Sequence, residues 1–508
     1  MYRILTASKD AYITDKIINN SFRATDGNTG QAGTLDLFKL FNETTITGSD
    51  QQREFSRLLL KFDISTLSDM LNDAKIDIND NTFNCELKLH DIYGGQTTPS
   101  NFNVIVFPLA QNFSEGSGYD VSQYEDIDAT NFITASISNG SAVLWNAKGA
   151  MESGSLGVSG LDVYTSGTLA GPAGSSLTSL TSEQHFVNGT EDLCVNVTKV
   201  VSGVISGQIP DYGFLVGYSG SFELNKKSYF VKRFASRNAA NTSIRPKLIV
   251  KYDDSIQDNH QDFIYDVTSS LYLNNFHYDS AANIIGGGAG EGELTGNNCM
   301  VLKLETGSFK KTFNVSQAQR GDNRITGLYS ASFAVSSFET LLRPHILATG
   351  SVTFDQVWTN STDNITYLSS SLTITNNKRF AFENFHQNLL VTVTNLRESY
   401  NVGDVIKIRV FSENRDRDIT FKKLPFEKKS QIYHQMHYRV RDFKTSEIVI
   451  PFDTVNNSTR LSTDASGMYF EFYLDSLYRG RTYVFDFLIK KNGFDTIITD
   501  AASKFRID

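Results

Sequence analysis

Two histidines, His434 and His437, lie three positions apart in the sequence and are candidates for metal ligands. On a helix both imidazoles would share one face, whereas on a strand they would point to opposite faces of a sheet. The surrounding residues favour a strand or a loop, and no cysteine or carboxylate lies at ligand spacing. We therefore expect structural polar contacts from both side chains and no bound metal.

Acidic residues occur close together at Glu291 and Glu293, and again at Glu125, Asp126 and Asp128. Paired carboxylates cleave glycosidic bonds at a separation of about 5 Å or about 6.5–9.5 Å, and nearness in sequence does not establish either distance. The first pair follows a run of glycines that lacks the Gly-Lys-Ser/Thr ending of a phosphate-binding loop. We expect that run to form a flexible hairpin or loop.

Three aromatic residues, Phe113, Tyr119 and Trp145, are candidates for a platform that stacks on a sugar ring. Aromatic rings cover the apolar faces of sugars well, but they also fill cores and protein interfaces. The segments 26–30 and 253–254 offer oxygen ligands for Ca²⁺ without the spacing of an EF-hand. A turn held by Asp and Asn side chains explains the first segment equally well. We assign no cofactor, and Ca²⁺ stays open as an alternative.

The composition favours strands over helices. The chain has 508 residues, of which 40% are hydrophobic, 20% charged and 12% aromatic, and this suits pleated, half-buried surfaces in about three domains. Its net charge of -9 opposes binding to a phosphate backbone, so we expect no nucleic-acid partner. No stretch approaches the ~18 apolar residues of a membrane span, and the first residues lack a signal peptide. The isolated Cys85, Cys194 and Cys299 are expected to be buried thiols.

Three blocks can be separated along the chain, at 1–254, 255–379 and 380–508. The first has short apolar runs rich in Val, Ile, Phe and Tyr, as in a β-sandwich. It is interrupted over about 140–189 by Gly, Ser, Thr and Ala, which predicts a long excursion outside the core. Helical spacing of apolar residues from Leu193 to Ile205 predicts one short helix. The polar, acidic segment 253–262 suits a linker.

The second and third blocks contain further alternating runs that predict small antiparallel sandwiches. The alternation is clearest in the third block, at 405–410, 468–474 and 482–489. Residues 376–508 contain 21 Lys or Arg and 17 Asp or Glu, so this end of an acidic chain is basic. The basic string 422–429 is expected to be a solvated loop or a face for an acidic neighbour.

The first block resembles DNRLRE-type domains, which are jelly-roll sandwiches related to carbohydrate-binding modules. The segments that carry this resemblance occur in the family's order and are Lys9–Ile13, Arg57–Ser65, Glu86–Leu89, Phe230–Arg237 and Arg245–Val250. The resemblance implies a jelly roll of about half the chain. The Gly/Ser-rich insertion and the stretch Ala235–Arg237 depart from the family's pattern.

The third block resembles immunoglobulin-like and fibronectin-like domains in the stretch Leu477–Phe485, which contains their Leu-x-x-Gly-x-x-Tyr corner. This resemblance implies that the hydroxyl of Tyr483 bonds back to the upstream backbone. The region 390–508, including Glu413–Asp418 and Gly493–Ile498, is also similar to the carboxy-terminal part of virion proteins of large marine T4-like tailed phages.

These observations together predict a non-enzymatic β protein with an N-terminal jelly roll and two immunoglobulin-like sandwiches. We expect it to be made in the host cytoplasm and built into a phage virion by contacts with other virion proteins in a symmetric multi-copy assembly. The tail, neck, baseplate and head decoration are all open as its place, and the tail is favoured. The first alternative is an adhesin that binds a host glycan or receptor through the N-terminal sandwich. The second is an enzyme that degrades polysaccharides.

Overall fold

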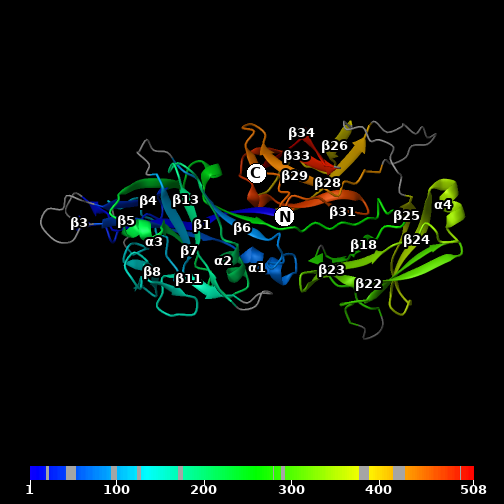
Figure 1. Cartoon of the computed structure of the whole chain (residues 1–508), viewed down its shortest axis with the longest axis horizontal. Coiled ribbons are helices and arrows are strands. Elements are labelled where there is room, and N and C mark those ends of the chain that lie inside the picture. The colour runs from blue at the N-terminus through cyan, green and yellow to red at the C-terminus, as the bar shows by residue number, and fades with distance from the viewer. Residues whose placement is uncertain are drawn as a thin grey trace. The chain divides into compact units, whose positions relative to one another are not determined.

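A computed structural model describes residues 1–18, 22–41, 53–92, 100–122, 128–169, 176–278, 280–287, 292–376, 388–415, 429–491 and 493–508. Strands are the dominant element, which confirms the prediction of a mainly β protein (Figure 1). The chain forms two compact units. Unit 1 contains residues 1–2, 70–82 and 252–508, and unit 2 contains residues 3–69 and 83–251. A separation of unit 1 into two domains at residue 379 stays a prediction.

Unit 2 is built on a ten-stranded sheet with the order β13-β7-β15-β5-β1-β17-β6-β14, in which β4 also pairs with β5 and β16 with β4. Its strands are β1 (Tyr2–Thr14), β4 (Thr34–Phe41), β5 (Arg53–Phe62), β6 (Asn84–Leu89), β7 (Phe102–Pro108), β13 (Ser182–Phe186), β14 (Leu193–Asn196), β15 (Phe214–Tyr218), β16 (Tyr229–Ala235) and β17 (Lys247–Lys251). In β6, Cys85, Leu87 and Leu89 are buried and alternate with half-buried residues. This is the period-two pattern of a strand with one face in the core.

Side chains join the two outer strands of this sheet. The Gln184 side chain, on β13, donates from Nε2 to the carbonyl of Asp192 (2.8 Å) and accepts at Oε1 from the backbone N–H of Cys194 (2.6 Å). Ser182 Oγ donates to the carbonyl of Asn196 (2.5 Å). The sheet therefore closes on itself through side-chain bonds where a backbone ladder is missing.

Shorter elements complete unit 2. The strands are β2 (Ile17–Ile18), β3 (Phe22–Arg23), β8 (Thr134–Ser138), β9 (Ser141–Leu144), β10 (Ser153–Ser155), β11 (Val163–Thr168) and β12 (Leu177–Ser179). The helices are α1 (Ser65–Asn72), which continues into unit 1, α2 (Thr198–Ile205), α3 (Gly220–Leu224) and the 3-10 turn η1 (Thr242–Ile244).

Two local predictions for this unit were wrong. The insertion 140–189 contributes to the core, because Trp145, Ala150 and Val163 belong to the same buried cluster as Leu59. A few apolar residues at buried positions suffice for this, although the average composition is polar. The helix expected from Leu193 begins only at Thr198, because residues 193–196 pair with β6 as strand β14.

In unit 1, the middle block is one six-stranded antiparallel sheet with the order β18-β23-β22-β21-β24-β25. Its strands are β18 (Ser269–Asn274), β21 (Met300–Thr306), β22 (Phe309–Arg320), β23 (Asn323–Phe333), β24 (Ser351–Asn360) and β25 (Thr366–Thr375), with the small hairpin β19 (Phe276–His277) and β20 (Ser280–Ala281) and the helix α4 (Arg343–Thr349). The sheet surrounds one core that contains the fully buried Trp358.

The chain before β18 covers both outer strands of this sheet. Asn259 donates its backbone N–H to Ser270 on β18 (2.9 Å). A few residues later, Tyr265 donates to Thr375 on β25 (3.0 Å), and Thr375 donates back to Phe263 (3.0 Å). The segment that precedes the sheet thus bonds to both of its edges.

The C-terminal block has the strand order of an immunoglobulin-like sandwich. One sheet is β26-β28-β32-β31 and the other is β27-β34-β33-β29-β30, which corresponds to strands A-B-E-D facing G-F-C. The strands are β26 (Leu389–Val393), β27 (Ser399–Tyr400), β28 (Val405–Asn414), β29 (Met436–Asp442), β30 (Ile448–Ile450), β31 (Ser462–Asp464), β32 (Gly467–Tyr473), β33 (Thr482–Lys491) and β34 (Phe494–Ile507), with the 3-10 turn η2 (Leu474–Ser476). Tyr438 stacks on Phe470 across the two sheets, and Phe485 stacks on Phe505 within the second sheet.

Tyr483 makes the contact that the Leu-x-x-Gly-x-x-Tyr pattern predicts. Its hydroxyl accepts a hydrogen bond from the backbone N–H of Tyr478 (2.9 Å) and donates to the carbonyl of the same residue (3.2 Å). Because the ring is fully buried, no water can replace either bond. The hydroxyl therefore fixes the turn that leads into β33.

We predict that Tyr483→Phe lowers the free energy of unfolding by about 1–3 kcal/mol, because it removes both hydrogen bonds between the buried hydroxyl and the backbone of Tyr478. Chemical denaturation of the full chain measures this change. Tyr278→Phe is the matched control, since the Tyr278 side chain is 90% exposed and its change should stay within about 0.5 kcal/mol. Equal effects of the two substitutions would contradict the role given to Tyr483.

Candidate functional site

The aromatic residues predicted to bind sugar do not form a platform. Phe113 and Trp145 are 0% and 4% exposed and lie in one core cluster, where the Trp145 Nε1–H donates to the carbonyl of Asn131 (2.9 Å). Tyr119 is 59% exposed. A buried ring offers no face to a ligand, so the structure corrects the prediction for Phe113 and Trp145.

The segment 26–30, considered for Ca²⁺, is organised by a buried amide. Asn28 Nδ2 donates to the carbonyls of Glu115 and Thr130 (both 2.8 Å), and Asn28 Oδ1 accepts from the N–H groups of Gly30 (3.1 Å) and Gly118 (2.7 Å). These bonds hold three loops together, as a turn stabilised by its own side chains would. Over the described ranges, no group of three or more His, Cys, Asp or Glu residues is arranged to hold a metal ion.

Next to this amide, an ion pair joins segments that are distant in the sequence. Arg237 Nε and Nη2 donate to the two carboxylate oxygens of Glu115 (2.5 and 2.6 Å), and its backbone N–H donates to Asp10 (2.5 Å). Burial raises the pKa of Asp10 to about 7, against the opposing effect of the Arg237 backbone N–H. The stretch Ala235–Arg237 therefore has a structural role in unit 2.

The two histidines of the predicted pair do not converge on a common ligand. His434 precedes β29 and contacts Asp262 through Nε2 (2.6 Å) and Gln257 through Nδ1 (2.9 Å). His437 is fully buried within β29, where desolvation lowers its pKa to about 4. His437 is thus a neutral core residue at physiological pH.

Several other predicted features fall wholly or partly outside the described residues. These are Glu125, Asp126, Glu291 and most of the basic string, of which only Lys429 is described. Glu293 accepts a hydrogen bond from Asn283 Nδ2 (2.8 Å). A pair of catalytic acids at these positions therefore stays a prediction.

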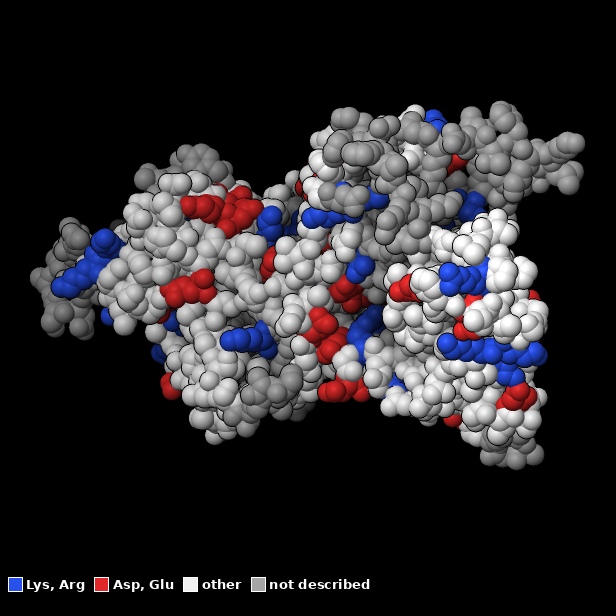
Figure 2. All heavy atoms as spheres, turned by 45° about the vertical axis from the view of Figure 1, so that its right-hand side comes forward, with Lys and Arg blue, Asp and Glu red and all other residues white. Residues whose placement is uncertain are grey.

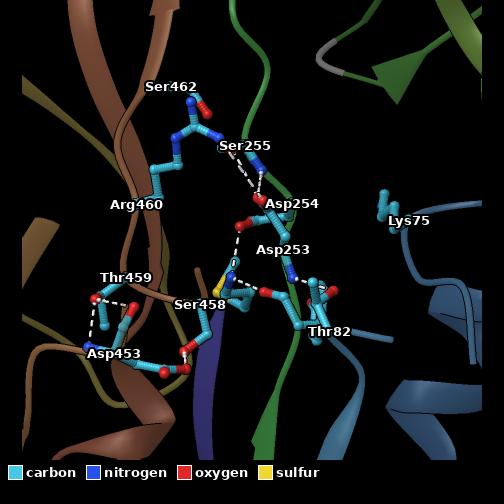
Figure 3. A network of polar contacts seen from close by, with 12 residues as sticks. Lys75, Thr82, Asp253, Asp254, Ser255, Asp453, Ser458, Thr459, Arg460 and Ser462 are labelled. Atoms are coloured by element: carbon cyan, nitrogen blue, oxygen red, sulfur yellow. Dashed lines mark hydrogen bonds and ion pairs between the residues drawn. The ribbon is translucent and has the colours of Figure 1, made fainter. Parts of the chain in front are cut away.

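One region of unit 1 with many polar contacts is the connecting segment, which we define as residues 253–265. At its start, Asp254 Oδ1 and the carbonyl of Tyr252 each accept from the Met1 amino group (2.5 Å). The backbone N–H of Asp253 donates to Thr82 Oγ1 (3.1 Å), and its carboxylate lies 4.0 Å from Arg460. Figure 3 shows Thr82 and Arg460 on either side of the chain at Asp253 and Asp254.

The connecting segment continues along the edge of the C-terminal block. The backbone N–H of Thr463, on β31, donates to the carbonyl of Ile256 (2.8 Å), and Gln257 and Thr463 form a parallel β-bridge. Thr463 Oγ1 donates to the carbonyl of Asp258 (2.8 Å), and Gln257 Nε2 donates to that of Leu461 (2.9 Å). The segment therefore pairs with β31 almost as an additional strand, which corrects its interpretation as a plain linker.

Asp258 is the most enclosed acid of the connecting segment. It is 4% exposed, and its carboxylate accepts from the backbone N–H groups of His260 (2.7 Å) and Tyr272 (3.2 Å). Desolvation raises its pKa to about 7 in spite of these bonds, and the charges of Asp464 and Asp262 act in the same direction. A protonated Asp258 is therefore the form that this environment favours.

A small pocket with a mixed polar and apolar lining is found in unit 2, where β13 and β14 meet. Its volume is about 210 Å³, and it is lined by Ser179, Leu180, Thr181, Ser182, Asn196, Val197, Lys199 and Val200. Lys199 Nζ donates to Thr178 Oγ1 (3.0 Å) beside it. Hydroxyl, amide and ammonium groups of this kind can bind the hydroxyls or the carboxylate of a small ligand. No sequence motif marks this pocket, because its residues come together only where the two outer strands of the sheet meet.

Comparisons with known proteins give distant structural matches only. No family model and no curated protein matches the chain. A titin structure, "Anomalous substructure of Titin-A168169", matches 50% of this chain and 94% of its own at 8% identity with a TM-score of 0.15. "Tandem Ig repeats of Dlar" matches 50% and 94% at 9% identity with a TM-score of 0.14. "Biofilm associated protein - BSP domain" matches 95% and 68% at 8% identity with a TM-score of 0.15.

We predict that Asp258→Asn reduces the loss of stability that the wild type shows on going from about pH 5 to pH 8. A carboxyl whose pKa rises from 3.8 to about 7 on folding stabilises the fold fully below pH 4, and this contribution is lost as the pH rises through 7. Its size is on the order of 4 kcal/mol. Denaturation of both proteins across this pH range measures the difference.

The control for this experiment is Asp322→Asn, in the exposed turn between β22 and β23, which should keep the wild-type pH profile. Asp10 contributes a dependence of the same sign in every variant, so a residual slope is expected. Parallel profiles for the wild type and Asp258→Asn would show that Asp258 is ionised in the folded state and would refute the prediction.

Proposed function

We propose that this chain is a structural protein of a tailed-phage virion that acts by docking to other virion proteins in a multi-copy assembly. The observation that carries the structural role is the connecting segment, which is bonded to β18 and β25 on one side and to β31 on the other. Hydrogen bonds of this kind restrict movement between the six-stranded sheet and the C-terminal sandwich. The phage source rests on the resemblance of residues 390–508 to virion proteins.

Exposed apolar side chains supply surface for such docking. Phe338, Leu341 and Leu347, in and before α4, are 69%, 50% and 77% exposed. Apolar groups gathered on one connection of a sandwich favour protein contacts. On the face drawn in Figure 2, basic and acidic side chains form small separate groups, so a partner there would meet both signs of charge. None of the described helices is long and apolar enough to cross a membrane.

We expect mass spectrometry of purified particles to find this chain in a fixed copy number, and complementation with Leu341→Asp/Leu347→Asp to leave the folded protein out of the particle. The matched control is Val455→Asp, which changes a side chain that is 86% exposed in the C-terminal block and should still be incorporated. Particles that lack the wild-type chain would refute the structural role. Normal incorporation of the double variant would refute docking through α4.

A second candidate function is binding of a glycan by unit 2, and the pocket at the meeting of β13 and β14 favours it. The ligand would be a small sugar unit bound through hydroxyl groups, with Lys199 available for a carboxylate. We expect a glycan array probed with the full chain to show saturable binding that Lys199→Ala weakens at least tenfold. Binding unaffected by Lys199→Ala, or none on the array, would remove this candidate.

A further inference from the structure

Lys232, on β16 of unit 2, has a fully buried side chain. Its Nζ lies 2.6 Å from Asp91 Oδ1, 2.9 Å from the carbonyl oxygen of Gly189 and 2.6 Å from that of Glu191. Asp91 follows β6, and its side chain is only 10% exposed. An amine and a carboxyl group from two different strands are thus held in direct contact inside the unit.

Two buried aromatic rings lie beside this contact. Lys232 Nζ lies 5.1 Å from the ring centres of Phe186 and Phe234, and both phenylalanines are 0% exposed. Burial lowers the pKa of Lys232 and raises the pKa of Asp91. The charge of each residue shifts the pKa of the other in the opposite direction, but burial has the larger effect. Desolvation therefore shifts the pair toward a neutral amine beside a neutral carboxylic acid, the forms in which a nitrogen lone pair can attack a carbonyl carbon.

The charge of Glu191 acts on the pKa values of both Lys232 and Asp91, which makes its carboxylate the candidate that moves a proton between them. Its Oε1 accepts from the backbone N–H groups of Val187 (3.0 Å) and Asn188 (2.8 Å), while Oε2 is buried and has no hydrogen-bond partner among the described residues. Burial acts to raise the pKa of Glu191, but the backbone N–H groups of Asn188 and Val187 outweigh it and leave the pKa lowered. The side chain is therefore an ionised carboxylate with one oxygen available to accept a proton.

We propose that Lys232 and Asp91 form an intramolecular amide bond that covalently joins β16 to the end of β6. The N–C bond forms between Lys232 Nζ and Asp91 Cγ, and the C–O bond to the carboxylic hydroxyl breaks. Glu191 takes a proton from the attacking amine and gives it to the departing hydroxyl, which leaves as water, so Glu191 ends unchanged. The reaction needs no oxidant and no cofactor.

The alternative is a buried ion pair, because the three oxygen atoms around Lys232 match the three N–H donors of an ammonium group. Lys39 provides an internal comparison. Its side chain is also buried, but Nζ contacts the carbonyls of Phe222 (2.7 Å) and Asn225 (2.5 Å) and the Asn225 side-chain oxygen (2.6 Å). Among the described residues, no carboxyl group forms a hydrogen bond with it. We expect Lys39 to remain a free amine.

Intact-mass spectrometry of the full chain, purified and then denatured, separates the two outcomes. We expect the wild type to weigh one water less than its sequence, and proteolysis to release one branched peptide that contains both Lys232 and Asp91. Lys232→Arg and Asp91→Ala should each have the full sequence mass. Glu191→Gln should form the bond more slowly, so that newly made protein is a mixture of both masses.

A succinimide at Asp26–Gly27 would also remove one water, but it would persist in Lys232→Arg and would give no branched peptide. The measurement on the wild type decides the question even if a variant fails to fold. A wild-type mass equal to the sequence mass, with separate peptides for Lys232 and Asp91, would overturn the proposal.

Discussion

A strand at the edge of a sheet leaves backbone N–H and C=O groups without partners, and the ways in which this chain covers such edges determine much of its architecture. In unit 2, the Gln184 side chain spans from β13 to the backbone beside β14. In unit 1, residues 258–265 cover both β18 and β25, and the preceding residues lie along β31. The hydrogen bonds that cover these edges therefore also attach the connecting segment to the six-stranded sheet and to the C-terminal sandwich.

Buried charges impose a second constraint, because a charged group removed from water is costly unless it is fully paired. Asp486 is fully buried and receives hydrogen bonds from both Arg439 and Arg441. Arg57 donates from Nε and Nη2 to the carboxylate of Glu223 and from Nη1 to the carbonyl of Gly149. The first pair joins the neighbouring strands β29 and β33, and the second joins β5 to the helix α3, so buried ion pairs determine which segments lie together. If the strands paired incorrectly, these buried charges would lose their partners, at a high cost in free energy.

The sequence predicted those features that depend on residues close together in the chain. Alternating burial in β6 and the turn that ends at Tyr483 were both recognisable, since a short stretch contains the whole pattern. The immunoglobulin-like strand order of the C-terminal block agrees with the expectation drawn from that turn.

Features that depend on distant segments were missed. Trp145 lies in a polar stretch, yet it is buried because Leu59 and Leu215 pack around it. The composition of the connecting segment predicts a linker, because its partners on β31 lie about two hundred positions further along the chain and leave no local pattern. The contact of Lys232 with Asp91 likewise spans 141 positions and carries no local signature. Long-range pairing of this kind is set by the topology of the sheets, which a single sequence does not reveal.

The path of the chain between the two units has a consequence for synthesis. Residues 70–82 belong to unit 1, but the chain then builds most of unit 2 before it returns at residue 252. Thr82 receives its hydrogen bond from Asp253, 171 residues later, and Arg320, which bonds to the carbonyl of Lys75, follows later still. At ordinary rates of translation this is a delay of roughly ten to thirty seconds. During that time a nascent chain exposes residues 70–82 outside the ribosome, and chaperones have an opportunity to bind there.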